Sequence, residues 1–170
     1  GSLIAVRRSR TKAKNPLKIM LLCHMDEIGF LVTHVSEKGW IHIDNVGGFD
    51  PRTLFARRVK VVTPDGDYPG VMNAGGRPLH ISSPEERKKV PEPLEFCIDL
   101  GMKAATVKRK VRVGAFVVMH EPFLELPEAF VSKAIDNRFA CFAAIEAIRA
   151  IDKARGRGGH HACEIVVAFT

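Results

Sequence analysis

The sequence predicts an α/β domain that is interrupted by an all-β, barrel-like insertion. Two apolar, strand-forming segments lie within residues 1–26, many short strand candidates fill residues 27–125, and a strand–helix–strand pattern returns in residues 126–170. Short strands punctuated by Gly- and Pro-containing turns are typical of small closed barrels or sandwiches. We therefore interpret 1–26 as the first part of the α/β domain, 27–125 as the insertion, and 126–170 as the continuation of the α/β domain.

Each element follows from a local pattern. The strands are predicted from apolar, β-branched runs, and the helices from apolar residues that recur every three or four positions. The longer helix is expected to end at the glycine-rich segment 155–159, because glycine commonly terminates helices. The expected strands are 3–6, 17–23, 28–32, 40–43, 59–62, 68–72, 94–100, 115–119, 130–131 and 164–169, and the expected helices are 104–110 and 137–155.

Composition indicates a globular chain and limits the kinds of partner that the chain is expected to bind. Of 170 residues, 46% are hydrophobic and 26% charged, and no apolar run reaches the roughly 18 residues that a membrane span requires. The net charge of +7 is spread over separate basic runs with one Trp and one Tyr, so we expect no nucleic-acid partner. The four cysteines are scattered, which favours reduced thiols and a cytoplasmic protein.

The segment His24-Met25-Asp26-Glu27-Ile28-Gly29 follows the second apolar strand. His24 and Asp26 are two positions apart, so they are expected to point to the same side. A histidine at a strand end can ligate a metal through one ring nitrogen while an acid fixes the other. The alternative is a surface histidine with an ordinary hydrogen bond.

A second candidate lies where the long helix begins. Asp136, within Ser132-Lys133-Ala134-Ile135-Asp136-Asn137-Arg138, precedes the helical periodicity. One interpretation is a helix N-cap, because Asp accepts bonds from the free N–H groups there. The other is a carboxylate that bridges two metal ions, with Asn137 and Arg138 fixing the turn.

Several short motifs in order resemble the glutamyl aminopeptidase family, the dinuclear metal aminopeptidases that include the tetrahedral (TET) enzymes, some of which are labelled endoglucanase. The resemblance covers nearly the whole chain. The motifs are 24–29 (HMDEIG), 45–50 (NVGGFD), 70–72 (GVM), 77–80 (RPLH), 98–101 (IDLG), 113–114 (VG) and 132–138 (SKAIDNR).

The resemblance implies roles for individual residues. His24 matches a metal ligand, Asp26 the catalytic-site acid that orients this histidine, and Asp136 the carboxylate that bridges two divalent ions, zinc or cobalt. It also implies a cis peptide bond after Asp136. His80 matches a position in the insertion. It is either a lid residue that reaches the site or an ordinary loop histidine.

The resemblance also implies what the complete protein does. It would release N-terminal residues from peptides through a metal-activated water, in a partial zinc-peptidase-like domain whose β insertion mediates dimers and dodecamers. The family's Glu-Glu pair, a further Asp and a distal His lie downstream of the matched motifs, so we interpret the chain as an N-terminal fragment. We expect it to bind metal poorly and to be inactive as given. The alternatives are a non-catalytic assembly module and a glycosidase, although no carboxylate pair flanking a sugar site is evident.

Overall fold

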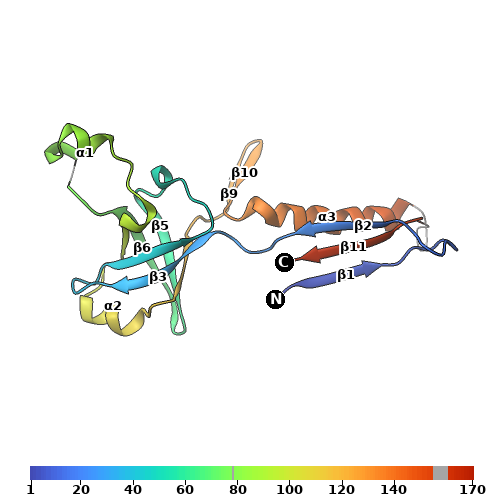
Figure 1. Ribbon diagram of the computed structural model, residues 1–170, viewed down its shortest axis with the longest axis horizontal. Coiled ribbons are helices and arrows are strands. Elements are labelled where there is room, and N and C mark those ends of the chain that lie inside the picture. The colour runs from blue at the N-terminus through green and yellow to red at the C-terminus, as the bar shows by residue number, and fades with distance from the viewer. Residues whose placement is uncertain (78, 155–160) are drawn as a thin grey trace. The chain divides into compact units, whose positions relative to one another are not determined.

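The computed structural model describes residues 1–77, 79–154 and 161–170, and these form two compact units (Figure 1). The first unit comprises Gly1–Glu27 and Ser132–Thr170, and the second comprises Ile28–Val131. The chain thus leaves the first unit, builds the second, and returns. Among the described residues, the structure contains no helix with the length and apolar character needed to cross a membrane.

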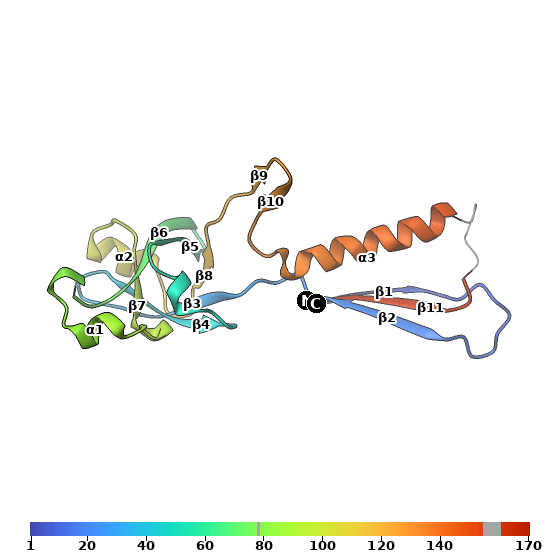
Figure 2. The ribbon, with the colours of Figure 1, turned by 90° about the horizontal axis from the view of Figure 1, so that it is seen from above.

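The first unit is a three-stranded sheet with one helix packed against it. Its strands β1 (Leu3–Arg7), β2 (Lys18–Cys23) and β11 (Glu164–Phe169) lie in the order β1-β11-β2, with β11 antiparallel to β1 and parallel to β2. Helix α3 (Ile135–Ala154) lies along one side of this sheet, as Figure 2 shows. The parallel β2–β11 pair is important because it brings the end of β2 close to the C-terminal residue Thr170.

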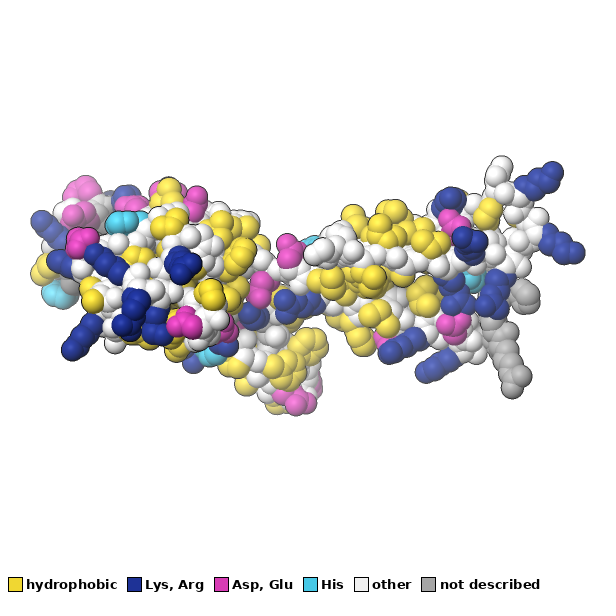
Figure 3. Space-filling model, turned by 90° about the horizontal axis from the view of Figure 1, so that it is seen from below, with side chains coloured by type: hydrophobic (Ala, Val, Ile, Leu, Met, Phe, Trp, Pro, Cys, Tyr) yellow, Lys and Arg dark blue, Asp and Glu magenta, His cyan; other side chains and the backbone are white. Residues whose placement is uncertain are grey.

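The core of the first unit forms where α3 meets the sheet. Side chains alternate across each strand, so every second residue of β11 faces the helix. The buried members of this cluster are Cys23, Ala144, Ile165 and Val167. Apolar side chains elsewhere in the unit remain exposed, and they gather on the face shown in Figure 3. Over the unit as a whole, the exposed apolar residues include Leu3, Ile4, Val6, Met20, Leu22, Phe139 and Phe142.

The second unit is a closed six-stranded antiparallel barrel, which confirms the predicted barrel-like insertion. The strand order is β3-β4-β7-β6-β5-β8, and each neighbouring pair is antiparallel. Inward side chains such as Ile41, Val59, Met72 and Ile98 are fully buried. The strands are β3 (Gly29–Val35), β4 (Ile41–Val46), β5 (Arg57–Thr63), β6 (Gly66–Ala74), β7 (Phe96–Asp99) and β8 (Phe116–Met119).

Short elements decorate the barrel. The helices are α1 (Pro84–Lys88) and α2 (Ala104–Lys110), the 3-10 turns are η1 (Pro51–Thr53), η2 (Leu79–Ile81) and η3 (Pro93–Glu95), and a hairpin is formed by β9 (Leu124–Leu126) and β10 (Ala129–Val131). Lys110 of α2 donates to Asp65 Oδ2 at 2.8 Å and contacts Tyr68 Oη, which fastens α2 to the β5–β6 hairpin.

Two sequence expectations differ from the structure. The unit boundaries are shifted: Glu27 groups with the α/β unit, and residues 126–131 group with the barrel unit, because β10 pairs with β9 in a hairpin. Helix α1 was not expected, although Ser83 and Glu86 form the reciprocal capping box that starts it. The predicted glycine-rich helix stop at 155–159 lies outside the described residues.

Candidate metal centre

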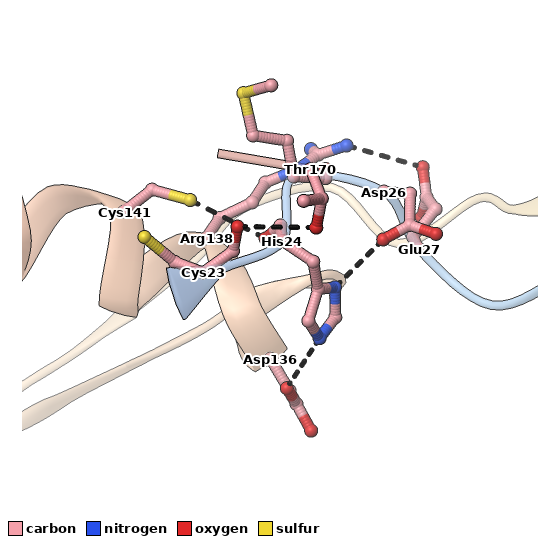
Figure 4. Close-up of polar contacts among 9 residues, drawn as sticks. Cys23, His24, Asp26, Glu27, Asp136, Arg138, Cys141 and Thr170 are labelled. Atoms are coloured by element: carbon pink, nitrogen blue, oxygen red, sulfur yellow. Dashed lines mark hydrogen bonds and ion pairs between the residues drawn. The ribbon is translucent and has the colours of Figure 1, made fainter. Parts of the chain in front are cut away.

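The candidate site begins where β2 ends. Parallel pairing with β11 continues past the strand, since Thr170 N donates to Cys23 O at 2.9 Å and Met25 N donates to Thr170 O at 2.7 Å. Cys141 on α3 also donates its thiol to His24 O at 3.5 Å. The backbone on both sides of His24 is therefore held by β11 and α3, and the imidazole projects from a fixed position (Figure 4).

The His24 ring lies between two carboxylates. Its Nδ1 is 2.8 Å from Asp26 Oδ1, and its Nε2 is 3.4 Å from Asp136 Oδ1 (Figure 4). The expectation that His24 and Asp26 point the same way is met, although both residues follow the last residue of β2. In the neutral ring, a proton on Nδ1 is donated to Asp26 and the lone pair of Nε2 faces Asp136. Two acceptors then face each other, an arrangement that a cation would stabilise.

The distance between these two acceptors matches that of two ligands on one metal ion. Ligands about 2.1 Å from a zinc ion at the tetrahedral angle lie roughly 3.4 Å from each other. The observed separation of His24 Nε2 from Asp136 Oδ1 is 3.4 Å. The Asp136 side chain is 95% exposed, so its second oxygen is accessible to another ion. This donor set fits part of a metal site.

Asp136 is placed by an irregular start to α3. The peptide bond from Asp136 to Asn137 is cis, as the resemblance implied, and both residues have non-helical backbone angles. Regular helical bonding resumes with Arg138, whose N–H donates to Ala134 O at 3.2 Å. The carboxylate of Asp136 points toward His24 (Figure 4).

A cluster of ion pairs holds together the segments that carry His24 and Asp136. Lys133 Nζ donates to Glu27 Oε1 at 2.9 Å, and Arg138 Nη2 lies 3.8 Å from the same oxygen. Arg138 also donates through Nε to Met25 O at 2.9 Å. The Glu27 side chain is only 18% exposed. Sequence reasoning gave Glu27 and Lys133 no role. The available signal was an acidic residue three positions after His24 and a basic residue three positions before Asp136.

The remaining sequence candidates occupy other positions. His80 is exposed and lies in η2 of the barrel unit, whereas His24, Asp26 and Asp136 belong to the first unit. Burial, reinforced by a hydrogen bond with Cys141, raises the pKa of the Cys23 thiol next to His24. Over residues 1–77, 79–154 and 161–170, no group of three or more His, Cys, Asp or Glu side chains is arranged to hold a metal ion.

Known proteins resemble most of this chain but extend well beyond it. The putative aminopeptidase FrvX of Escherichia coli K12 is 31% identical over 156 residues, which cover 89% of this chain and 42% of that protein. The chain therefore spans less than half the length of this curated relative.

Solved structures share the fold. A TET aminopeptidase from the Thaumarchaeota archaeon SCGC AB-539-E09 gives a TM-score of 0.82 at 29% identity, covering all of this chain and 47% of that one. The TET1 peptidase of Pyrococcus horikoshii, described as assembling into a tetrahedron or a large octahedral shell, gives 0.77 at 28%, with coverages of 100% and 48%. A Thermotoga maritima protein described as an endoglucanase gives 0.71 at 27%, with coverages of 100% and 46%.

The family profile described as M42 glutamyl aminopeptidase matches residues 1–170. The match covers segments 24–29 and 132–138, which carry the candidate ligands, and the barrel inserted between them in the sequence. The chain belongs to the M42 glutamyl aminopeptidase family.

Proposed function

We propose that this chain contributes two metal ligands, His24 and Asp136, to a metal-dependent aminopeptidase. The observation that carries the proposal is the 3.4 Å approach of His24 Nε2 to Asp136 Oδ1, with Nδ1 already held by Asp26. Imidazole and carboxylate are ligands that suit zinc and cobalt. Family membership supports peptides as the substrate class.

Each residue has a separate task in this proposal. Bound divalent ions would supply a polarised substrate carbonyl and a water of lowered pKa. Asp26 fixes the His24 tautomer by accepting the Nδ1 proton, which keeps the Nε2 lone pair available. Glu27, through Lys133 and Arg138, keeps the segment after β2 beside the start of α3. The exposed Asp136 carboxylate has room to bridge a second ion.

The activity, the substrates and the assembly are proposed for a complete protein. Relatives such as FrvX are more than twice as long as this chain. We propose a homo-oligomer, from dimer to dodecamer, because the P. horikoshii TET1 peptidase is described as assembling into closed shells. His80 is proposed as a lid residue carried by the barrel unit. The four free cysteines of the chain support a cytoplasmic location.

Metal titration of the 170-residue chain tests the ligand assignment. We expect weak binding of Zn²⁺ or Co²⁺, because a catalytic zinc site usually has three protein ligands. His24→Ala and Asp136→Asn should each weaken that binding by at least about tenfold. Asp26→Asn should weaken it by about 10–100-fold, as for other partners of metal-bound histidines.

Glu146→Gln is the matched control, because Glu146 is a partly exposed acid on α3 that pairs with Arg149 at 2.6 Å. It should leave the affinity unchanged. Equal affinities for the native chain and for both ligand variants would remove His24 and Asp136 from the metal site.

A further inference from the structure

The hairpin of β9 and β10 is an arm whose apolar side chains remain in solvent. All residues of its two strands are exposed, and both ribbon views draw the hairpin apart from the barrel strands (Figures 1 and 2). Phe123 and Phe130 stack with ring centroids 5.9 Å apart, yet they are still 64% and 52% exposed. A two-stranded hairpin is at best marginally stable in water unless it packs on another surface. The arm therefore presents an apolar surface that a second surface would stabilise.

The same arm carries negative charge. Residues 121–131 contain three glutamates and no lysine or arginine. Glu121 pairs with Arg57 at 3.0 Å. Glu125 and Glu128 are exposed, and neither has an ion-pair partner within the part of the chain that the structure describes. Glu125 lies opposite Phe130 in the strand register, so both side chains project from one face. That face combines an aromatic surface with uncompensated negative charge.

A groove of about 780 Å³ on the barrel unit has the opposite character. It is lined by residues from the η1 turn, from the end of β6, and from the segment that carries α1 and η3. This surface is called the basic groove, because four basic and two acidic side chains line it: Arg52, Arg77, Arg87 and Lys89, with Glu86 and Glu95.

Both acids of the basic groove already have partners inside the same chain. Glu86 accepts a backbone N–H at 2.8 Å in the capping box that starts α1. Glu95 accepts Lys89 Nζ at 2.7 Å. On the basic side, Arg52 is neutralised by its ion pair with Asp50. The charge that these contacts leave over in the groove is therefore positive.

Two arginines supply this remaining charge. Arg87 donates through Nε to a neutral acceptor, Ser82 O, at 3.1 Å. Over the described residues, neither Arg77 nor Arg87 forms an ion pair. The lining also includes Phe55 and Val90, which are 49% and 47% exposed. The basic groove thus offers apolar side chains together with two unpaired cations, which complements the hairpin in both respects.

We propose that the β9–β10 hairpin of one copy of this chain docks in the basic groove of a second copy. Glu125 and Glu128 then meet Arg77 and Arg87, and the aromatic pair of the hairpin packs on the apolar part of the groove. Charge complementarity of this kind selects the partner and fixes the register of the contact. The contact rests on the homo-oligomer proposed above and identifies the surfaces through which its copies bind. Since hairpin and groove are different surfaces, each copy offers both halves of the contact, and repeating it builds closed assemblies.

Sedimentation velocity of the chain over a wide range of concentrations tests the contact. The groove variant is Arg77→Glu with Arg87→Glu, and the hairpin variant is Glu125→Lys with Glu128→Lys. Each variant should raise the dissociation constant of self-association by at least about tenfold, because like charges then face each other. An equimolar mixture of the two variants should regain the native affinity, since the reversed hairpin of one meets the reversed groove of the other.

Arg109→Glu with Arg112→Glu is the matched control. Both are exposed arginines of the barrel unit outside the basic groove, and the net charge changes as in the groove variant. This control should associate like the native chain. His24→Ala should do so too, so failure of the metal-ligand proposal and failure of this one are distinguishable. Circular dichroism of each variant checks that it folds.

Three results would overturn the docking contact. One is a native chain that stays monomeric at every concentration. Another is equal self-association of the native chain and both charge-reversal variants, which would keep the homo-oligomer but exclude these surfaces. The third is a mixture of the two variants that stays as dissociated as each variant alone, because complementary charges on different copies would then not restore the contact.

Discussion

Replacing Gly70 by alanine should destabilise the barrel, because the strand pairing leaves no room for a side chain there. Gly70 is a buried residue of β6, opposite Val59 of β5. A Cβ atom at this position would lie 2.7 Å from Ile98 Cγ2, 2.7 Å from Leu100 Cδ2 and 2.9 Å from Asp99 O. The two side-chain atoms can shift, but Asp99 O belongs to the backbone of β7.

The expected cost follows from this overpacking. Forcing an extra methyl group into a packed core costs typically about 1–3 kcal/mol. With a urea dependence of roughly 2 kcal/mol per molar, the unfolding midpoint should fall by roughly 0.5–1.5 M. Gly48→Ala is the matched control, since a Cβ there would meet nothing within 4 Å and the residue has no left-handed backbone. Its midpoint should stay close to that of the native chain.

Urea unfolding followed by tryptophan fluorescence is the assay. The single tryptophan, Trp40, lies beside β4 in the barrel unit, so its signal reports the unfolding of this unit. Far-UV circular dichroism at the same urea concentrations adds the signal of α3 from the other unit. Equal midpoints for Gly70→Ala and Gly48→Ala would refute the argument that β7 excludes a side chain from Gly70.

Three further predictions concern the core, the acid response and the thiols. Ile98→Ala should lower the free energy of unfolding by about 2–5 kcal/mol, measured with the same fluorescence assay, because Ile98 is fully buried. Hydrogen bonds from Lys110, Thr63 and Tyr68 lower the pKa of Asp65, so its stabilising effect is present above about pH 4 and is lost on further acidification. Urea midpoints measured between about pH 4 and pH 2 should therefore depend less on pH in Asp65→Asn than in the native chain. Cys23 should react with a thiol reagent only after unfolding, because burial raises its pKa; Cys23→Ser should remove this slow thiol from the titration.

Patterns that repeat over several residues were predictable from the sequence. The apolar runs located all six barrel strands to within a few residues, because each strand alternates between core and solvent over four or more positions. The hairpin of β9 and β10 was not predicted from the sequence, because strands of three residues are too short to show an alternation of apolar and polar side chains. Helix α1 was missed although Ser83, Pro84 and Glu86 carry its starting signal.

The candidate site was predictable only in part. Strand alternation placed His24 and Asp26 on one side, but no local pattern could bring Asp136 next to them across the whole barrel. That expectation came from resemblance to a family, and the approach of Asp136 to His24 rests on the packing of α3 against β2. The ion pair between Glu27 and Lys133 likewise forms only because the chain returns to the α/β unit after the barrel, and the spacing of residues in the sequence does not predict that return.

The ion pair between Glu27 and Lys133 has a consequence for replacing the inserted barrel with another domain. Glu27 is the last residue of the α/β unit before the barrel and Lys133 is among the first after it, so the barrel is inserted between two residues that pair with each other. The entropic cost of loop closure depends weakly on length, about 0.6 kcal/mol for each doubling. A shorter hairpin or a different barrel could therefore be grafted between these two residues while His24 and Asp136 keep their approach. The junction is a natural position for combining the same pair of candidate ligands with a different inserted domain.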